Sequence, residues 1–215
     1  MKDIAIYGAG GLGREIACIL KEINEQESTW NLVGFFDDGM EKGSSNEYGT
    51  ILGGMSELNQ WEGDLAVIIG IGNPKITHLL VNKITNEQIS FPNIISPDVK
   101  FLDRDSLKIG KGNFINFKAS VSCNVTIGNF NSIGAFTALG HDCKVGDFNT
   151  LMPSVQVCGF VEMGQQNFLG ISSIVLQMNK IGNGITLGAG SILMKDAEDD
   201  RTYFGNPARS IIAKK

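Results

Sequence analysis

The sequence predicts two units of different fold class: a small Rossmann-like α/β unit with a parallel sheet over residues 1–95, and a parallel β-helix of six-residue repeats over residues 96–215. Two observations carry this prediction. A glycine-rich turn, Gly8 to Gly13, follows a short apolar stretch near the N-terminus, and aliphatic residues recur every six positions in the second half. The composition changes near Ser96 and Pro97, where helical patterns stop and Gly and Asn become frequent.

The first unit alternates strand-like and helix-like segments. We expect a strand from Asp3 to Tyr7, a helix from about Leu12 to Ile23, a strand ending at Asp37 and Asp38, a strand in "DLAVIIGIGNP", a helix reaching about Thr85, and a last strand near Ile89 to Ile95. Such alternation is typical of a parallel sheet whose ligand loops lie at the carboxyl ends of the strands.

The turn after the first strand satisfies G-x-G-x-x-G with Gly8, Gly10 and Gly13. Glycines in such a loop let phosphates reach a helix N-terminus, while an acidic residue after the next strand binds a ribose. The motif alone favours a dinucleotide, and a nicotinamide-nucleotide-binding protein is one alternative reading. A dinucleotide normally needs two mononucleotide-binding halves, and residues 1–95 supply about one, so a single nucleotide fits better.

The second half is a hexad array. Stepping by six from Ile109 to Leu193 gives fifteen aliphatic residues, and Gly follows nine of them. Neither a helix nor an alternating strand has this period, whereas a coil with three short faces does. We expect the aliphatic residues to point inward and the glycines to permit a tight backbone at crowded corners.

Three hexads make a coil of 18 residues, so residues 18 apart should stack at about 4.8 Å. Asn113, Asn131, Asn149 and Asn167 have this spacing. We interpret them as a structural ladder of side-chain amides.

Composition excludes several classes of protein. Lys+Arg 18 against Asp+Glu 23 gives a net charge of −5, without a basic block for nucleic acid. The longest apolar run, "LAVIIGIG", is shorter than the roughly 20 residues of a membrane span, and the N-terminus lacks a signal-type pattern. We therefore predict a cytoplasmic protein without a membrane partner. Its four cysteines show no CxxC spacing and are expected to be reduced.

His141 is the residue that the array does not explain. It is the third residue of its hexad, away from the buried position, with Asp142 next to it and Gly159 one coil on. Imidazole is a natural general base near neutral pH, and an amide N–H beside a missing side chain can donate to an oxyanion. Chelation of a metal by His141, Asp142 and Cys143 is disfavoured, because adjacent strand residues point to opposite faces. No metal is predicted.

The segments "HDCKVGDF" and "CGFVEMG" resemble the core of the bacterial PglD/NeuD type of sugar acetyltransferase, within the hexapeptide-repeat acyltransferases. This resemblance implies a left-handed parallel β-helix, although general rules favour right-handed crossovers. It implies acetyl-CoA as co-substrate, and a homotrimer with active sites between subunits, which the flat β-helix faces also make reasonable. It implies His141 as the base, Asp142 as its acidic partner and the Gly159 amide as the oxyanion donor.

The same resemblance assigns the first unit to the nucleotide of a UDP-sugar. Gly8, Gly10, Gly11 and Gly13 would line the phosphate loop, and Asp37 and Asp38 would contact the uridine. The ending "YFGNPARSIIAKK" is similar to the family's C-terminus, so that Arg209, with Lys214 and Lys215, would pair with coenzyme A phosphates. Gly159 would also contact coenzyme A.

Three positions depart from the family pattern. Thr150 and Leu12 stand where family members often carry histidine, and "IISP" from Ile94 lacks the histidine often found before the proline. We expect acetyl transfer to an amino or hydroxyl group of a sugar, in surface-glycan or sialic-acid biosynthesis. A catalytically inactive β-helix scaffold is the other alternative, which Thr150 keeps open.

Overall fold

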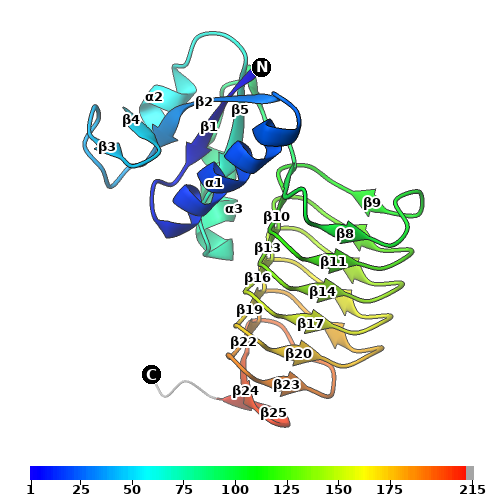
Figure 1. Cartoon of the computed structure of the whole chain (residues 1–215). Coiled ribbons are helices and arrows are strands. Elements are labelled where there is room, and N and C mark those ends of the chain that lie inside the picture. Colours follow the sequence, from blue (N-terminus) through cyan, green and yellow to red (C-terminus); the bar gives the residue numbers. More distant parts are fainter. Residues whose placement is uncertain (212–215) are drawn as a thin grey trace.

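The computed structural model describes residues 1–211, so Lys214 and Lys215 lie outside the described residues. An α/β unit at the N-terminus is followed by a column of stacked coils, and a short hairpin ends the column (Figure 1). The two units correspond to the two fold classes that the sequence predicts.

The N-terminal unit is built on a six-stranded sheet in the order β3-β4-β2-β1-β5-β6. Its strands are β1 (Lys2–Tyr7), β2 (Trp30–Phe36), β3 (Ser45–Asn46), β4 (Gly49–Gly53), β5 (Leu65–Ile69) and β6 (Ile89–Ser90). All neighbouring pairs are parallel except the β3–β4 hairpin. Both β2 and β5 pair with the central strand β1, and an open parallel sheet forms its ligand crevice at such a switch point.

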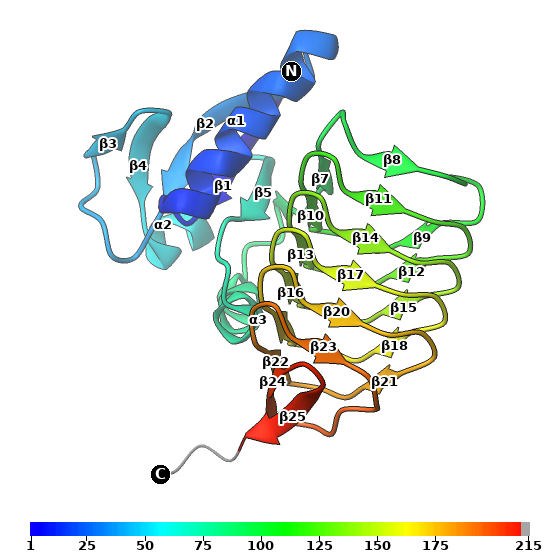
Figure 2. The ribbon, with the colours of Figure 1, turned by 60° about the horizontal axis from the view of Figure 1, so that its bottom comes forward.

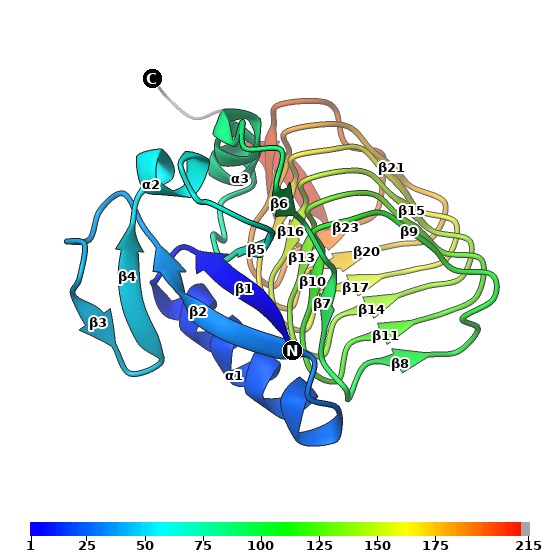
Figure 3. The same ribbon diagram turned by 90° about the horizontal axis from the view of Figure 1, so that it is seen from above.

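Both faces of this sheet are covered by helices (Figure 3). On one face α1 (Gly11–Gln26) packs with Ile4 and Ile6, and on the other α2 (Met55–Asn59) and α3 (Pro74–Lys83) pack with Ala5 and Tyr7. The alternation along β1 is the two-residue period of a strand. The cluster under α1 also contains Phe114 of the β-helix, so the two units share a hydrophobic core.

Aromatic side chains join the two units at a second place, beside α3, which lies against the coils (Figure 2). Phe91 meets Phe130 edge to face at 5.1 Å, and His78 meets Phe148 at 4.8 Å. Phe130 and Phe148 stack on each other at 5.2 Å. These contacts fix the position of the α/β unit on the β-helix.

Two parts of the first unit differ from the prediction. The hairpin β3–β4 and helix α2 were not predicted, because residues 45–59 carry no clear period. The single strand expected near Ile89 to Ile95 is two strands: β6 pairs with β5, whereas β7 (Ile94–Ile95) pairs with β10 (Phe114–Ile115) of the β-helix. Pro92 lies between them and has no backbone N–H to continue a ladder.

The second unit is a parallel β-helix with three faces, each a sheet of short strands. The face toward the α/β unit consists of β7, β10 (Phe114–Ile115), β13 (Ser132–Ile133), β16 (Thr150–Leu151), β19 (Phe168–Leu169), β22 (Thr186–Leu187), β24 (Thr202–Gly205) and β25 (Ala208–Ile211). The next face consists of β8 (Lys100–Phe101), β11 (Ser120–Val121), β14 (Ala138–Leu139), β17 (Gln156–Val157), β20 (Ile174–Val175) and β23 (Ile192–Leu193). The third consists of β9 (Lys108–Ile109), β12 (Thr126–Ile127), β15 (Lys144–Val145), β18 (Glu162–Met163) and β21 (Lys180–Ile181).

The 18-residue register is confirmed by the strand pairs. Ile133 pairs with Leu151, and Leu151 with Leu169, with all three side chains buried in the interior. The asparagine ladder is also confirmed. Asn113, Asn131, Asn149 and Asn167 are buried, and each amide oxygen accepts from the backbone N–H of the residue one coil on.

The glycines after the aliphatic residues have a different role from the one expected. The tight corner torsions belong to the residues two positions later, most of which are not glycine, such as Phe130 and Phe136 with φ of 54° and 60°. The glycines are required by crowding between coils instead. A Cβ on Gly134 would lie 2.6 Å from the backbone nitrogen of Pro153, in the next coil.

The β-helix begins one coil earlier than the hexad search indicates. The step from Phe101 to Ile109 is eight residues rather than six, so the first coil, β7 to β9, falls outside the strict period. The last coil is shorter: Leu187 pairs with Tyr203, a step of sixteen residues. The regular register is therefore confined to the interior of the column.

Candidate active site

His141 lies in the turn between β14 and β15, and Asp142 follows it with a left-handed backbone, φ 60°. Nδ1 of His141 is 2.8 Å from Oδ2 of Asp142. A carboxylate only accepts hydrogen bonds, so this contact places the imidazole hydrogen on Nδ1 and leaves Nε2 as the free base. The two side chains are 52% and 34% exposed, which leaves the imidazole accessible to a reactant.

Gly159 makes room for this imidazole. A Cβ at Gly159 would lie 2.7 Å from both Cε1 and Nε2 of His141, so the ring occupies the space of the missing side chain. Phe160 packs edge to face against the imidazole at 5.0 Å. Among residues 1–211, no hydrogen-bond acceptor faces the N–H of Gly159. A free base and a free amide donor therefore lie at one place.

The neighbouring thiol of Cys143 does not fit the role of nucleophile. Cys143 is buried and donates from Sγ to the carbonyl of Cys158 at 3.0 Å. Burial raises the pKa of Cys143, which keeps it a neutral thiol.

The glycine-rich loop lies at the β1/β5 switch point of the sheet. Gly8 has φ +106°, and a Cβ there would lie 2.8 Å from the carbonyl oxygen of Gly70; a Cβ on Gly13 would overlap the carbonyl of Gly8. Packing of the protein itself thus requires Gly8 and Gly13. Gly10 and Gly11 are different, because a Cβ at either would meet nothing within 4 Å. No side chain caps the N-terminus of α1 here, so its first N–H groups remain available to an anion.

Gly72, in the loop after β5, shares this property with Gly10 and Gly11, since a Cβ on it would also meet nothing within 4 Å. The sequence shows a turn there but gives no sign that the glycine faces the crevice. Open space beside three glycines with ordinary torsions is what a closely approaching ligand requires.

Asp37 and Asp38 follow β2 at the same edge of the sheet. Asp37 accepts from the N–H of Ala9 at 2.9 Å, which ties it to the glycine loop. Asp38 accepts from the hydroxyl of Tyr7 at 2.6 Å and the N–H of Met55 at 2.8 Å. These bonds, the Tyr7 bond first, lower the pKa of Asp38, while burial and Asp38 raise the pKa of Tyr7. Both carboxylates thus stabilise the crevice, and their contact with a nucleotide stays a prediction.

Comparison with known proteins shows which proteins the chain resembles. The family model described as PglD N-terminal domain matches residues 3–84. A GDP-perosamine N-acetyltransferase of Escherichia coli O157:H7 is 27% identical over 219 residues, which cover 98% of this chain and 97% of its own. The first unit is therefore a PglD N-terminal domain, and the whole chain is similar to sugar acetyltransferases of the PglD/NeuD type.

Solved structures agree with this similarity. The acetyltransferase domain of PglB from Neisseria gonorrhoeae FA1090, in complex with acetyl coenzyme A, superposes with a TM-score of 0.88 at 25% identity, over 98% of this chain and 99% of its own. PerB from Caulobacter crescentus, in complex with CoA and GDP-perosamine, has the same fold, with a TM-score of 0.89 at 22% identity and 98% of both chains covered. The predicted left-handed β-helix is thereby confirmed.

Two departures from the PglD/NeuD pattern meet in one cavity. Leu12 of α1 and Thr150 of β16 both line a cavity of about 260 Å³ between the α/β unit and the β-helix, together with Glu15, Gly72 and Met152. Because Gly72 also borders the glycine crevice, this cavity is its continuation. The two positions at which the resemblance led us to expect histidine, Leu12 and Thr150, thus lie on the walls of a single cavity.

Arg209 lies on β25 beside a cavity of about 400 Å³ that is also lined by Lys195, Met194 and Tyr203. Lys195 was not singled out in the sequence, but it lies on the same corner as His141, three coils of 18 residues further on. The two cations are both exposed.

The predicted site residues form two groups that do not meet within one chain. The glycine loop faces the turns that contain Asn116, Gly134 and Pro153, whereas His141 lies at the corner between the second and third faces. Viewed along the column, that corner is on the side away from the α/β unit (Figure 3).

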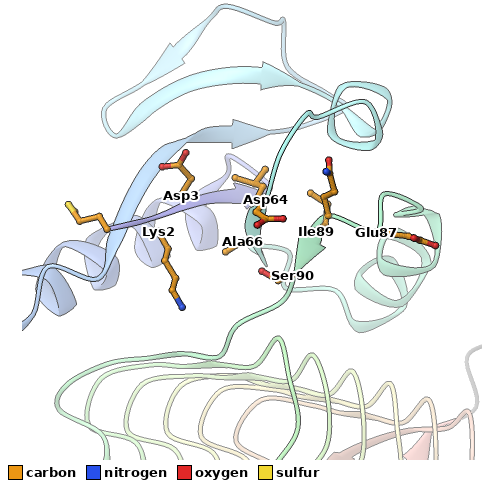
Figure 4. Close-up of a pocket in the computed structure, with 10 residues that line it drawn as sticks. Lys2, Asp3, Asp64, Ala66, Glu87, Ile89 and Ser90 are labelled. Atoms are coloured by element: carbon orange, nitrogen blue, oxygen red, sulfur yellow. The ribbon is translucent and has the colours of Figure 1, made fainter.

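A larger cavity, about 650 Å³, opens at the opposite end of the sheet (Figure 4). It is lined by Lys2, Asp3, Asp64 and Glu87 among others. It lies at the amino ends of the parallel strands, away from the switch-point loops, so we do not assign it to the reaction.

Over residues 1–211, no three His, Cys, Asp or Glu side chains are grouped to hold a metal ion. Within the same residues, no helix has the length and hydropathy to cross a membrane.

Proposed function

We propose that the chain transfers the acetyl group of acetyl-CoA to an amine or hydroxyl of a sugar carried on a nucleoside diphosphate. The observation that carries the proposal is the His141–Asp142 pair, with a free Nε2 above Gly159. A relative that matches over 97% of its own length is named as an N-acetyltransferase of a GDP-linked sugar, whereas the family resemblance implied a UDP-linked one. The proposal therefore covers nucleoside diphosphate sugars of both kinds.

In this reaction Nε2 of His141 removes a proton from the acceptor as its nitrogen or oxygen attacks the thioester carbonyl. The new C–N or C–O bond forms while the carbonyl oxygen becomes an oxyanion, which the N–H of Gly159 stabilises. The C–S bond then breaks, and the imidazolium returns its proton to the leaving thiolate. Asp142 stabilises the imidazolium between these steps.

The acetyl-CoA site follows from the corner that His141 shares with Lys195. Three coils separate the two residues, or about 14 Å at the usual strand spacing. A pantetheine arm laid along this corner would join a thioester at His141 to phosphates at Lys195 and Arg209, in the cavity that both cations line.

The acceptor site is the crevice of Gly10, Gly11 and Gly72, with the sugar extending into the cavity of Leu12 and Thr150. Because this crevice and His141 lie on different sides of one chain, we propose a homotrimer in which His141 of one subunit reaches the acceptor held by its neighbour. Exposed apolar residues at the corners support such contacts: Phe136, Phe160, Ile171 and Met178 are 48–70% exposed. The cytoplasmic location and the role in surface-glycan or sialic-acid biosynthesis stay predictions.

The test is release of free thiol from acetyl-CoA with a panel of UDP- and GDP-linked amino sugars and the corresponding free sugars. We expect turnover with a nucleotide-linked sugar and loss of at least about a hundredfold in kcat for His141→Ala, with acetyl-CoA binding retained. Full activity of His141→Ala would contradict the assignment of His141 as the general base. Failure of the native chain to bind acetyl-CoA would instead favour the inactive scaffold, and binding of NADH the nicotinamide alternative.

A further inference from the structure

A polar column occupies the corner that carries His141. Ser106, Asn124 and Asp142 are each 18 residues apart and hold the same position in successive coils. Asn124 and Asp142 both have left-handed torsions, with φ of 55° and 60°, which Asn and Asp tolerate better than most residues. One coil further on, the column becomes apolar at Phe160.

Hydrogen bonds connect this column from end to end. The backbone N–H of Asn124 donates to Oγ of Ser106 at 2.8 Å, and Nδ2 of Asn124 donates to Oδ1 of Asp142 at 3.3 Å. The other carboxylate oxygen, Oδ2, accepts from Nδ1 of His141. The amide must present its NH₂ group to Asp142, because an amide oxygen facing a carboxylate oxygen would be repelled.

The first coil holds the upper end of the column. Ser106 belongs to the eight-residue step between Phe101 and Ile109, and its hydroxyl donates to the carbonyl of Asp103 at 3.5 Å. The two extra residues of this coil therefore lie at the corner of the active site. Ser106 itself keeps the regular position of the column, and its hydroxyl oxygen accepts from the backbone N–H of Asn124.

This arrangement matters because the catalytic pair is open to solvent. With a side chain 34% exposed, Asp142 has room to turn its oxygens toward water. A donor on Oδ1 restricts that rotation and keeps Oδ2 facing the imidazole. A fixed carboxylate in turn keeps the imidazole in one tautomer and one orientation.

We propose that Asn124 is a positioning residue of the transfer reaction, whose amide holds Asp142 so that Nε2 of His141 stays directed at the acceptor. The proposal rests on the proposed function, in which His141 is the base. Asn124 acts through Asp142 and touches neither substrate.

The test replaces the amide donor without changing its size. Asn124→Asp keeps a residue that tolerates the left-handed torsion but puts a carboxylate against Asp142. We expect kcat to fall about tenfold, with the KM for acetyl-CoA unchanged. Ser106→Ala should lower kcat in the same sense by a smaller factor.

Asn183→Asp is the matched control. Asn183 also donates from Nδ2 to a carboxylate, Oδ2 of Asp199, at 3.3 Å on an exposed surface, but on a different corner from His141. Its replacement should leave kcat unchanged. Equal losses for the Asn183 and Asn124 variants would show a general effect on the β-helix and overturn the proposal.

A double-mutant cycle decides whether the effect passes through Asp142. In an Asp142→Gly background, where glycine adopts the same torsion without strain, Asn124→Asp should cause no further loss. The same tenfold loss in both backgrounds, or no loss in the native background, would overturn the proposal. Full activity of His141→Ala, in contrast, would show that the proposed function itself had failed.

Discussion

At the scale of single residues, the site depends on missing side chains as much as on present ones. His141, Asp142 and Gly159 were predicted together, because a fixed spacing of 18 residues converts sequence separation into contact. Gly72 and Asn124 were missed. Gly72 matters because the space beside it is open, and Asn124 because its amide donates to Asp142. Spacing in the sequence indicates neither property.

Gly159 should be the least replaceable glycine of the site. In Gly159→Ala the new Cβ would occupy the position of the His141 ring, 2.7 Å from Nε2, so the imidazole must turn away. We expect kcat to fall about a hundredfold, since a displacement of about 1 Å is enough for such a loss. Steady-state kinetics with a thermal melt would check this. An unchanged kcat would show that the ring does not work from this position.

A substitution at Gly11 can separate an effect on stability from an effect on substrate binding. Its Cβ position is open and lies at the first residue of α1, so Gly11→Ala should raise stability by about 0.5 kcal/mol through the unfolded state. The same methyl group would obstruct a phosphate in the crevice, and we expect the KM for the nucleotide sugar to rise while the KM for acetyl-CoA stays constant. Equal KM values for native and variant chains would remove the crevice from the acceptor site.

At the scale of elements, periodic segments were predictable and irregular ones were not. The hexads gave every interior coil, because one buried aliphatic residue per face is a strong constraint. The first coil was not predicted, because its eight-residue step breaks the period. The elements β3, β4 and α2 were not predicted either, because their residues carry no clear period. The left-handed corner torsions were also not predicted, because Phe, Lys and Met, which stand at several of these positions, have no preference for a positive φ.

The asparagine ladder is the element whose loss should cost most stability. Asn131→Ala would leave the N–H and Nδ2 of Asn149 without the buried oxygen that they share. We expect a loss of about 3 kcal/mol in the free energy of unfolding, measured by chemical denaturation at a fixed protein concentration. Asn183→Ala, at an exposed asparagine on the same face boundary, is the control and should lose less than about 1 kcal/mol.

At the scale of the whole molecule, the two halves of the site lie on different sides of one chain. Their separation was not readable from the sequence, because the motifs do not state which corner faces the α/β unit. The shared core of α1 with Phe114, and the contacts of Phe91 with Phe130 and of His78 with Phe148, hold this arrangement. Neither half can therefore swing toward the other without breaking buried contacts.

This separation predicts complementation between inactive subunits. His141→Ala removes the base, and Gly11→Glu blocks the crevice with a long acidic side chain, so each variant alone should be inactive. If the variants are unfolded reversibly and refolded together, some sites combine the intact crevice of one chain with the intact histidine of the other. Recovery of about a quarter of native activity is expected for equal mixing, and light scattering gives the assembly size. No recovery from assemblies shown to be mixed would place both halves in one chain.

The same separation determines how a defective copy behaves when a cell also makes a sound one. Each proposed site draws one half from each of two chains, so a chain that lacks only the histidine lowers activity in direct proportion to its share. A chain that lacks both the crevice and the histidine inactivates two sites in its assembly. Activity then falls with the square of the fraction of intact chains. A defective gene copy would therefore lower activity more than in proportion to its share only if its product still assembles with intact chains.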